Sequence, residues 1–197
     1  MAGHFEPVPG GGAAVPLDEV EIAILRSLAA QLLELIGPGD EPVEGEDPLA
    51  ALFAEGPSEP PADPALARLF PEAYAGPDAD EQDEELRALS AEFRRFTETD
   101  LRSRKRADAI AVVRSLDSLT ATGEGGAVLK LTADESLHWL GALNDLRLTI
   151  GTRLEVGDED ENAELYRLPD SDPRKPMVMA YLWLGALQET LVDTLMS

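Results

Sequence analysis

The two histidines are the side chains in this sequence best suited to proton transfer, because imidazole changes charge near neutral pH. His4 lies in a segment rich in Gly and Pro. His138 lies between Leu137 and Trp139 in an apolar helical pattern. Neither histidine is part of a motif that joins a nucleophile to a base. The sequence therefore predicts a helix-surface or partly buried imidazole at His138, no catalytic residues and no enzyme.

Metal and cofactor sites are not predicted either. The sequence contains no cysteine, so it offers no thiolate ligands, disulfides or thiol pair for redox sensing. The acidic run at 158–161 lacks the alternating ligands and central glycine of a calcium loop. The glycine clusters at 10–12 and 123–126 lack the lysine and helix entry of a phosphate-binding loop. We expect both clusters to act as breaks between elements.

Positive charge is concentrated in one stretch of an otherwise acidic chain. The net charge is −23, yet eight of the 16 Lys and Arg residues lie between Arg87 and Arg114, where only four acidic residues occur. This basic stripe could bind an acidic partner, or it could neutralise the protein's own acidic loops. The candidate partner-binding residues within it are Arg94, Arg95, Arg102, Arg104, Lys105 and Arg106.

The overall charge and hydropathy exclude two classes of partner. A charge of −23 repels nucleic acid phosphates and anionic lipid surfaces, so we expect no direct nucleic acid binding. The longest apolar stretch, 177–187, is shorter than the roughly 20 residues that span a membrane. The first 16 residues lack the pattern of a signal peptide. These features predict a cytoplasmic protein without a membrane partner.

Helical periodicity predicts a mainly α protein with a compact bundle of four to five helices. A capping box at Asp18 and Glu21 starts the first helix, which ends at 37–38. A second capping box, Thr132 with Glu135, starts a helix that Gly151 is expected to end. The last helix is expected to begin at 172–173 or at 175–176 and to run through 195.

The basic stripe falls within the longest helical stretch, 77–123. Either one helix of about 40 residues or two helices that meet near Thr97 fit the pattern. Its apolar residues form two stripes of the kind that a helix packs against a core. The members are Leu86, Leu89, Phe93 and Phe96 in the first stripe, and Ile110, Val113, Leu116 and Leu119 in the second.

The remaining segments predict a small β element and two irregular regions. Residues 127–131 are the best strand candidate, and 152–156 is the expected partner in a two-stranded pairing. Residues 1–16 are expected to form a mobile N-terminal arm, and 17–197 a single helical domain.

A long acidic loop, rich in Pro and Gly, is expected as an insertion at about 37–62. Within it, 47–53 resembles the later segment 63–70, and each begins with an Asp-Pro pair. Both segments are expected to form short helices, and packing on the protein's own core is favoured over partner binding.

Four runs of residues carry a resemblance to a known family: 93–102 (FRRFTETDLR), 139–148 (WLGALNDLRL), 151–154 (GTRL) and 187–191 (LQETL). With them the chain resembles the actinobacterial family with domain of unknown function 2017, some members of which are labelled oxidative stress regulators. The resemblance implies an effect on transcription through contact with a sigma factor. Some relatives carry paired cysteines for redox sensing, and that property does not transfer to this chain.

The predicted function is a non-enzymatic regulatory protein that needs no cofactor and acts by binding another protein. The resemblance points to a sigma factor or RNA polymerase. The alternative is an adaptor or accessory factor linked to Clp-type proteolysis, since family genes tend to lie beside that of a Clp adaptor, and the loop at 37–62 would then be its tether. The best family motif also has four polar residues, which are expected to form either an internal network or a partner surface: Asn144, Asp145, Arg147 and Arg153.

Overall fold

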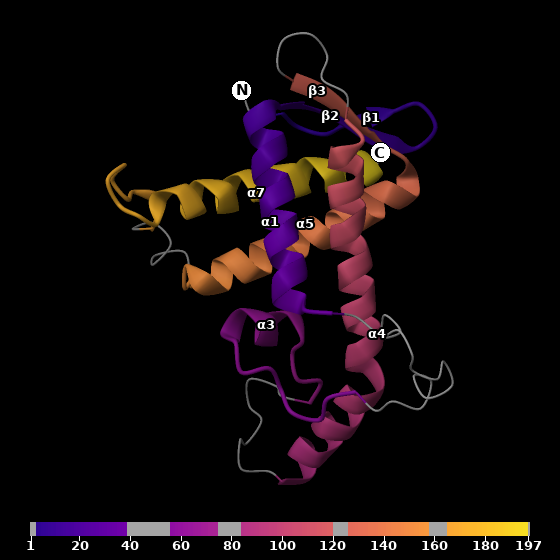
Figure 1. Ribbon diagram of the computed structural model, residues 1–197, viewed down its shortest axis with the longest axis vertical. Coiled ribbons are helices and arrows are strands. Elements are labelled where there is room, and N and C mark those ends of the chain that lie inside the picture. The colour runs from indigo at the N-terminus through magenta and orange to yellow at the C-terminus, as the bar shows by residue number, and fades with distance from the viewer. Residues whose placement is uncertain (1–2, 39–55, 75–83, 120–125, 158–164, 197) are drawn as a thin grey trace.

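The computed structural model describes residues 3–38, 56–74, 84–119, 126–157 and 165–196. These residues form five helices and a three-stranded sheet (Figure 1). Most of the predicted acidic insertion, including 47–53, lies outside these residues. The elements are β1 (Glu6–Val8), β2 (Gly12–Asp18), α1 (Glu19–Ile36), α3 (Pro64–Leu69), α4 (Glu84–Asp117), β3 (Gly126–Leu131), α5 (Ala133–Arg153) and α7 (Lys175–Leu195).

The sheet is antiparallel in the order β1-β2-β3, so it has one strand more than the sequence predicted. β1 and β2 form a hairpin whose turn holds Gly10 and Gly11 at positive φ. Here the structure differs from the expected mobile arm at 1–16. Alternate residues of β2, Ala13, Val15 and Leu17, are buried, and this burial holds the segment on the core.

The strand expected at 127–131 is confirmed as β3, but its predicted partner is wrong. β3 pairs with β2 and places Leu129 opposite Val15, whereas most of 152–156 belongs to the end of α5 and the turn after it. Gly151 does not end the helix. It is buried against Tyr181, where a Cβ would lie 3.3 Å from the ring. Glu155, with φ +54, supplies the left-handed residue that follows the helix.

The predicted helix starts are confirmed by their caps. The Asp18 carboxylate accepts a hydrogen bond from Glu21 N at 2.8 Å, and Thr132 Oγ1 accepts one from Glu135 N at 3.2 Å. α7 begins at Lys175 with Pro176 in its first turn, which is the later of the two predicted starts. α3 carries the predicted Asp63 cap and buries its apolar side on the protein's own core.

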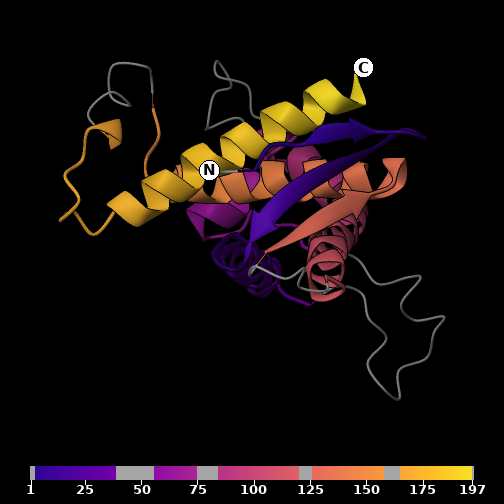
Figure 2. The ribbon, with the colours of Figure 1, turned by 90° about the horizontal axis from the view of Figure 1, so that it is seen from above.

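Helices α1 and α4 pack alongside each other, and α5 and α7 run across them (Figure 1). From above, α5 lies between α7 and the α1–α4 pair (Figure 2). Trp139 of α5 is buried at this junction and meets Phe5 edge-on at 6.1 Å. α4 is a single helix of 34 residues rather than two. No helix in the described ranges is long and apolar enough to cross a membrane.

Candidate functional site

Arg94 of the basic stripe points into the protein. Its side chain is 5% exposed and forms an ion pair with Glu98, which is 3% exposed. Both terminal nitrogens of Arg94 also donate to the carbonyl oxygen of Phe70 at 3.2 Å. A buried guanidinium is tolerated when it has a counter-charge and hydrogen bonds. Arg94 therefore fastens the residue after α3 to the inner side of α4.

Arg102 repeats this arrangement two turns later. It donates to Glu98 Oε1 at 2.7 Å and to the carbonyl oxygen of Ile36, and its guanidinium lies 4.6 Å from the Phe70 ring centre. Glu98 is thus shared between two arginines. Arg106, one turn further, donates to the carbonyl oxygen of Gly37. These two arginines meet the negative end of the α1 dipole, which stabilises the junction of α1 and α4.

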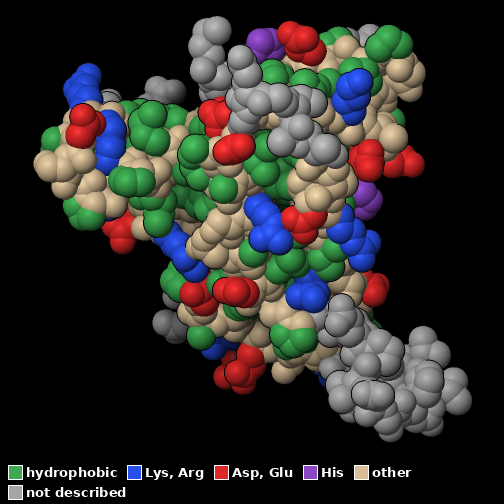
Figure 3. Space-filling model, turned by 45° about the horizontal axis from the view of Figure 1, so that its top comes forward, with side chains coloured by type: hydrophobic (Ala, Val, Ile, Leu, Met, Phe, Trp, Pro, Cys, Tyr) green, Lys and Arg blue, Asp and Glu red, His purple; other side chains and the backbone are tan. Residues whose placement is uncertain are grey.

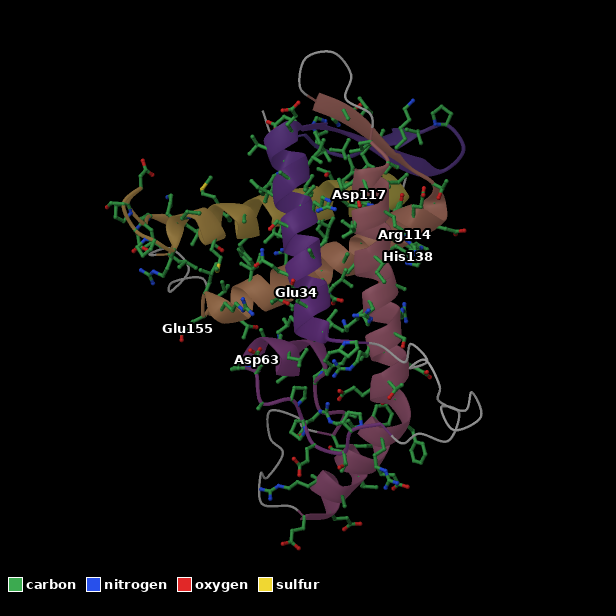
Figure 4. The ribbon with its side chains drawn as sticks, viewed as in Figure 1. Glu34, Asp63, Arg114, Asp117, His138 and Glu155 are labelled. Atoms are coloured by element: carbon green, nitrogen blue, oxygen red, sulfur yellow. The ribbon has the colours of Figure 1, made fainter. Side chains whose placement is uncertain are left out.

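A second charged cluster lies where α4 crosses α5. Lys105 Nζ donates to Asp145 Oδ1 at 2.7 Å, with side-chain exposures of 14% and 3%. Burial raises the pKa of the Asp145 carboxyl above its ordinary value, although Lys105 opposes the shift. One turn along α4, the Asp108 carboxylate lies 2.6 Å from His138 Nδ1 and packs against Gly141, where a Cβ would collide with it. Figure 4 shows His138 beside Arg114 at this crossing.

The four residues of the family motif do not form one network. Asp145 belongs to the α4–α5 crossing, where the exposed Asn144 also hydrogen-bonds to it. Arg147 joins α5 to α7, since it donates to Gln188 Oε1 at 2.7 Å and lies 5.4 Å from the Tyr181 ring centre. Arg153 is exposed and lines a separate groove. The motif thus serves several helix contacts.

The six candidate partner-binding residues divide in the same way. Arg94, Arg102, Lys105 and Arg106 have internal bonds, Arg95 is half-buried, and Arg104 is exposed. Their internal partners include Glu98, Asp145 and backbone carbonyl oxygens. For internal pairing, the sequence predicted the acidic loops as the partners. Acidic and basic side chains are interspersed among hydrophobic ones on the face that Figure 3 presents. The basic side chains of the described residues on that face do not form a continuous surface.

The first apolar stripe of α4 faces solvent, whereas the sequence predicted that it packs against the core. Leu89, Phe93 and Phe96 are 41%, 47% and 69% exposed, whereas Arg94 and Glu98 of the same turns are buried. The physical reason is the shared Glu98 carboxylate. Its two arginines and their carbonyl acceptors fix the rotation of α4 about its axis, so residues on the other side must point outward. The spacing of Arg94, Glu98 and Arg102 at intervals of four was the sequence signal for this face.

Several hollows accompany these features in the described part of the chain. The hollow lined by His138, Arg114 and Ser115 has a volume of about 640 Å³. Another of about 200 Å³ lies beside Phe93 and is also lined by Phe70, Glu72 and Leu101. A groove of about 550 Å³ lies between α1, α5 and α7, with mainly aliphatic walls and Glu34 and Arg153 among its polar residues. No group of three or more potential metal ligands occurs in the described part of the chain.

Comparisons with a family model and with individual known proteins agree on one family. Residues 2–195 match the family DUF2017, described as a domain of unknown function. The chain is similar to the oxidative stress regulator AosR of Mycobacterium tuberculosis (strain ATCC 25618 / H37Rv) and to that of Mycobacterium bovis. Each is 31% identical over 182 residues, which covers 89% of this chain and 78% of the relative. No solved structure matches the chain.

Proposed function

This chain belongs to the DUF2017 family, and from that premise we propose that it is a non-enzymatic regulatory protein that acts by binding another protein. Its relatives are named oxidative stress regulators, and similarity along most of the chain supports a regulatory role here. The partner that we propose is the transcription machinery, either a sigma factor or RNA polymerase. The protein would act in the cytoplasm without a cofactor and without contacting DNA itself.

One observation carries the proposal. The buried ionisable groups of the described part, Glu98 with its arginines and Asp145 with Lys105, are paired with one another and hold helices together, and this pairing also holds for Arg94 and Glu98 where they line the hollow of about 200 Å³. Catalytic groups need access to a substrate. Meanwhile aromatic side chains of α4 stay exposed, as at protein interfaces, where aromatic residues contribute much of the binding energy.

Oxidant sensing by this chain would differ from a thiol switch. Its 197 residues contain no cysteine, so these residues cannot form a disulfide in response to an oxidant. The regulatory contact that we propose is therefore independent of cysteine. Any response to stress would come through the partner or through the amount of this protein.

The test is direct binding to purified RNA polymerase core, holoenzyme and isolated sigma factors from an actinobacterium. The immobilised protein is measured by biolayer interferometry at two salt concentrations. An unrelated acidic protein of similar net charge serves as the control for electrostatic capture. Saturable binding that the control lacks supports the proposal. Absence of binding to all three preparations, or binding to duplex DNA at physiological salt, contradicts it.

A further inference from the structure

The outward side of α4 between Leu89 and Asp100 combines features of a docking surface. We infer that this side, which we call the α4 outer face, binds an amphipathic, basic helical segment of a partner protein. The inference rests on the proposed function, since it assumes that the protein acts by protein binding. It assigns the contact to side chains that are not among the six candidate partner-binding residues, although Phe93, Phe96 and Asp100 belong to the family run 93–102.

The first step is that the face is apolar and held outward. Leu89, Phe93 and Phe96 follow each other at intervals of four and three residues, so their side chains share one side of the helix. All three are more than a third exposed, and Phe96 is 69% exposed. The buried bonds of Glu98 to Arg94 and Arg102 lie on the other side of α4. Turning the aromatic rings inward would break those bonds.

The second step is that the face is shaped as well as apolar. The Tyr74 ring, 46% exposed, meets the Phe93 ring edge-on with centroids 6.1 Å apart. Beside Phe93 lies the hollow of about 200 Å³, lined by the apolar Phe70 and Leu101 and also by the paired Arg94 and Glu98. A hollow next to exposed aromatic rings can receive one large apolar side chain, which is the usual arrangement of an interface hot spot.

The third step is the charge around the face, which selects the occupant. Glu92 and Asp100 are exposed on the same side of α4 as Phe96, and Glu72 is exposed at the rim of the hollow. Of the arginines nearby, Arg94 and Arg102 have their charges committed on the inner side and Arg95 is half-buried. The exposed Arg104 lies one turn beyond Asp100, past the end of the face. The face is therefore apolar with an acidic border. Its complement is an amphipathic helix whose apolar side is flanked by Lys or Arg.

A second copy of this chain fits less well. In a symmetric dimer through this face, the acidic border would meet its own copy, and each chain carries a net charge of −23. Like charges placed opposite each other disfavour such contacts. A basic partner segment instead gains from the same border, and its approach is accelerated by the overall negative charge.

The experiment measures the binding of a fluorescein-labelled amphipathic leucine–lysine peptide by fluorescence anisotropy. The test variant is Phe93→Ser with Phe96→Ser. The matched control is Leu137→Ser with Val128→Ser, which removes two apolar side chains that are 60% and 50% exposed on α5 and β3. Circular dichroism verifies that both variants keep the wild-type melting temperature. A peptide with Glu in place of Lys tests the charge preference.

We expect the test variant to bind the lysine peptide at least about tenfold more weakly, and the control to match the wild type. We expect Glu92→Lys with Asp100→Lys to weaken binding without loss of fold, which keeps the inference testable if the serine variant unfolds. Equal affinity of all variants, failure of the wild type to bind, or equal binding of the glutamate peptide overturns the inference. So does a wild-type dimer in sedimentation that Phe96→Ser dissociates.

The two proposals can fail separately. If RNA polymerase or a sigma factor binds the wild type and the test variant equally, the proposed function stands and the α4 outer face is not its surface. If the lysine peptide shows the expected pattern while the transcription machinery does not bind, the surface stands and the proposed partner is wrong.

Discussion

Replacing Lys105 by Met tests how far the charged residues of α4 act as structural elements. In the folded protein Lys105 Nζ lies 2.7 Å from the Asp145 carboxylate, which is nearly inaccessible to solvent. Methionine preserves most of the length of the side chain but removes the charge. The buried carboxylate of Asp145 then loses its counter-charge while the surrounding helices stay packed.

The magnitude follows from the unequal burial of the two partners. Removing Lys105 leaves a charge with only 3% exposure, so we expect a loss of about 3–5 kcal/mol in the free energy of unfolding near neutral pH. Asp145→Asn leaves Lys105, whose side chain is 14% exposed and can reach water, so we expect a loss of only about 1–2 kcal/mol. The double variant should resemble Asp145→Asn, because it buries no unpaired charge.

The assay is urea unfolding followed by far-ultraviolet circular dichroism, with the fluorescence of the two tryptophans, Trp139 and Trp183, as a second probe. The pH dependence gives a further check. Burial raises the folded-state pKa of Asp145 above 3.8, and Lys105→Met should raise it further. A carboxyl group whose pKa is higher in the folded state than in the unfolded state stabilises the fold at a pH below its unfolded-state pKa. This stabilisation is lost as the pH rises through the folded-state pKa. The cost of Lys105→Met should therefore be larger at about pH 7 than at about pH 4.

Equal losses for Lys105→Met and Asp145→Asn would refute this reasoning, since the asymmetry depends on Asp145 being the more buried partner. Strictly additive losses in the double variant would show that the two side chains do not interact in solution. A cost of Lys105→Met that does not depend on pH would show that Asp145 is not the group left unpaired.

Three further substitutions test the packing of the helices, each measured by urea unfolding. Glu98→Gln should cost about 3–5 kcal/mol because it leaves two guanidinium groups without their shared counter-charge, and a loss below about 1 kcal/mol would contradict the buried network. Gly141→Ala should be less stable than its control Gly185→Ala by about 1 kcal/mol, because its methyl group displaces the Asp108 carboxylate that lies against His138, whereas a Cβ at Gly185 meets no atom closer than 3.5 Å. Asp18→Ala removes the α1 cap and should cost about 1 kcal/mol, with an unchanged free energy of unfolding as the outcome against it.

Local sequence signals were sufficient for most of the helices. The boxes at Asp18 and Thr132 fixed two helix starts, because a cap depends only on residues three positions apart. The pairing of β3 with β2 was not accessible in this way. It joins segments more than a hundred residues apart, and the alternation of Ala13, Val15 and Leu17 is short and interrupted by a proline.

The orientation of α4 could not be predicted from the sequence alone. Hydrophobicity alone predicts that Phe93 and Phe96 face the core and that Arg94 and Arg102 face solvent. The structure reverses this, because Phe70 and Ile36 supply carbonyl acceptors from distant segments that satisfy the arginines. No single-helix pattern contains those acceptors. The regular spacing of the charged residues was visible, but its partners were not.

One binding measurement decides between the α4 outer face and the exposed Arg104 of the basic stripe. Phe96→Ser and Arg104→Ala are immobilised beside the wild type, and their affinities for RNA polymerase holoenzyme are compared by biolayer interferometry. Both positions are exposed, one on the α4 outer face and one in the basic stripe. We predict a loss of affinity of about tenfold for Phe96→Ser and none for Arg104→Ala. The reverse order, or no binding by the wild type, would contradict the account.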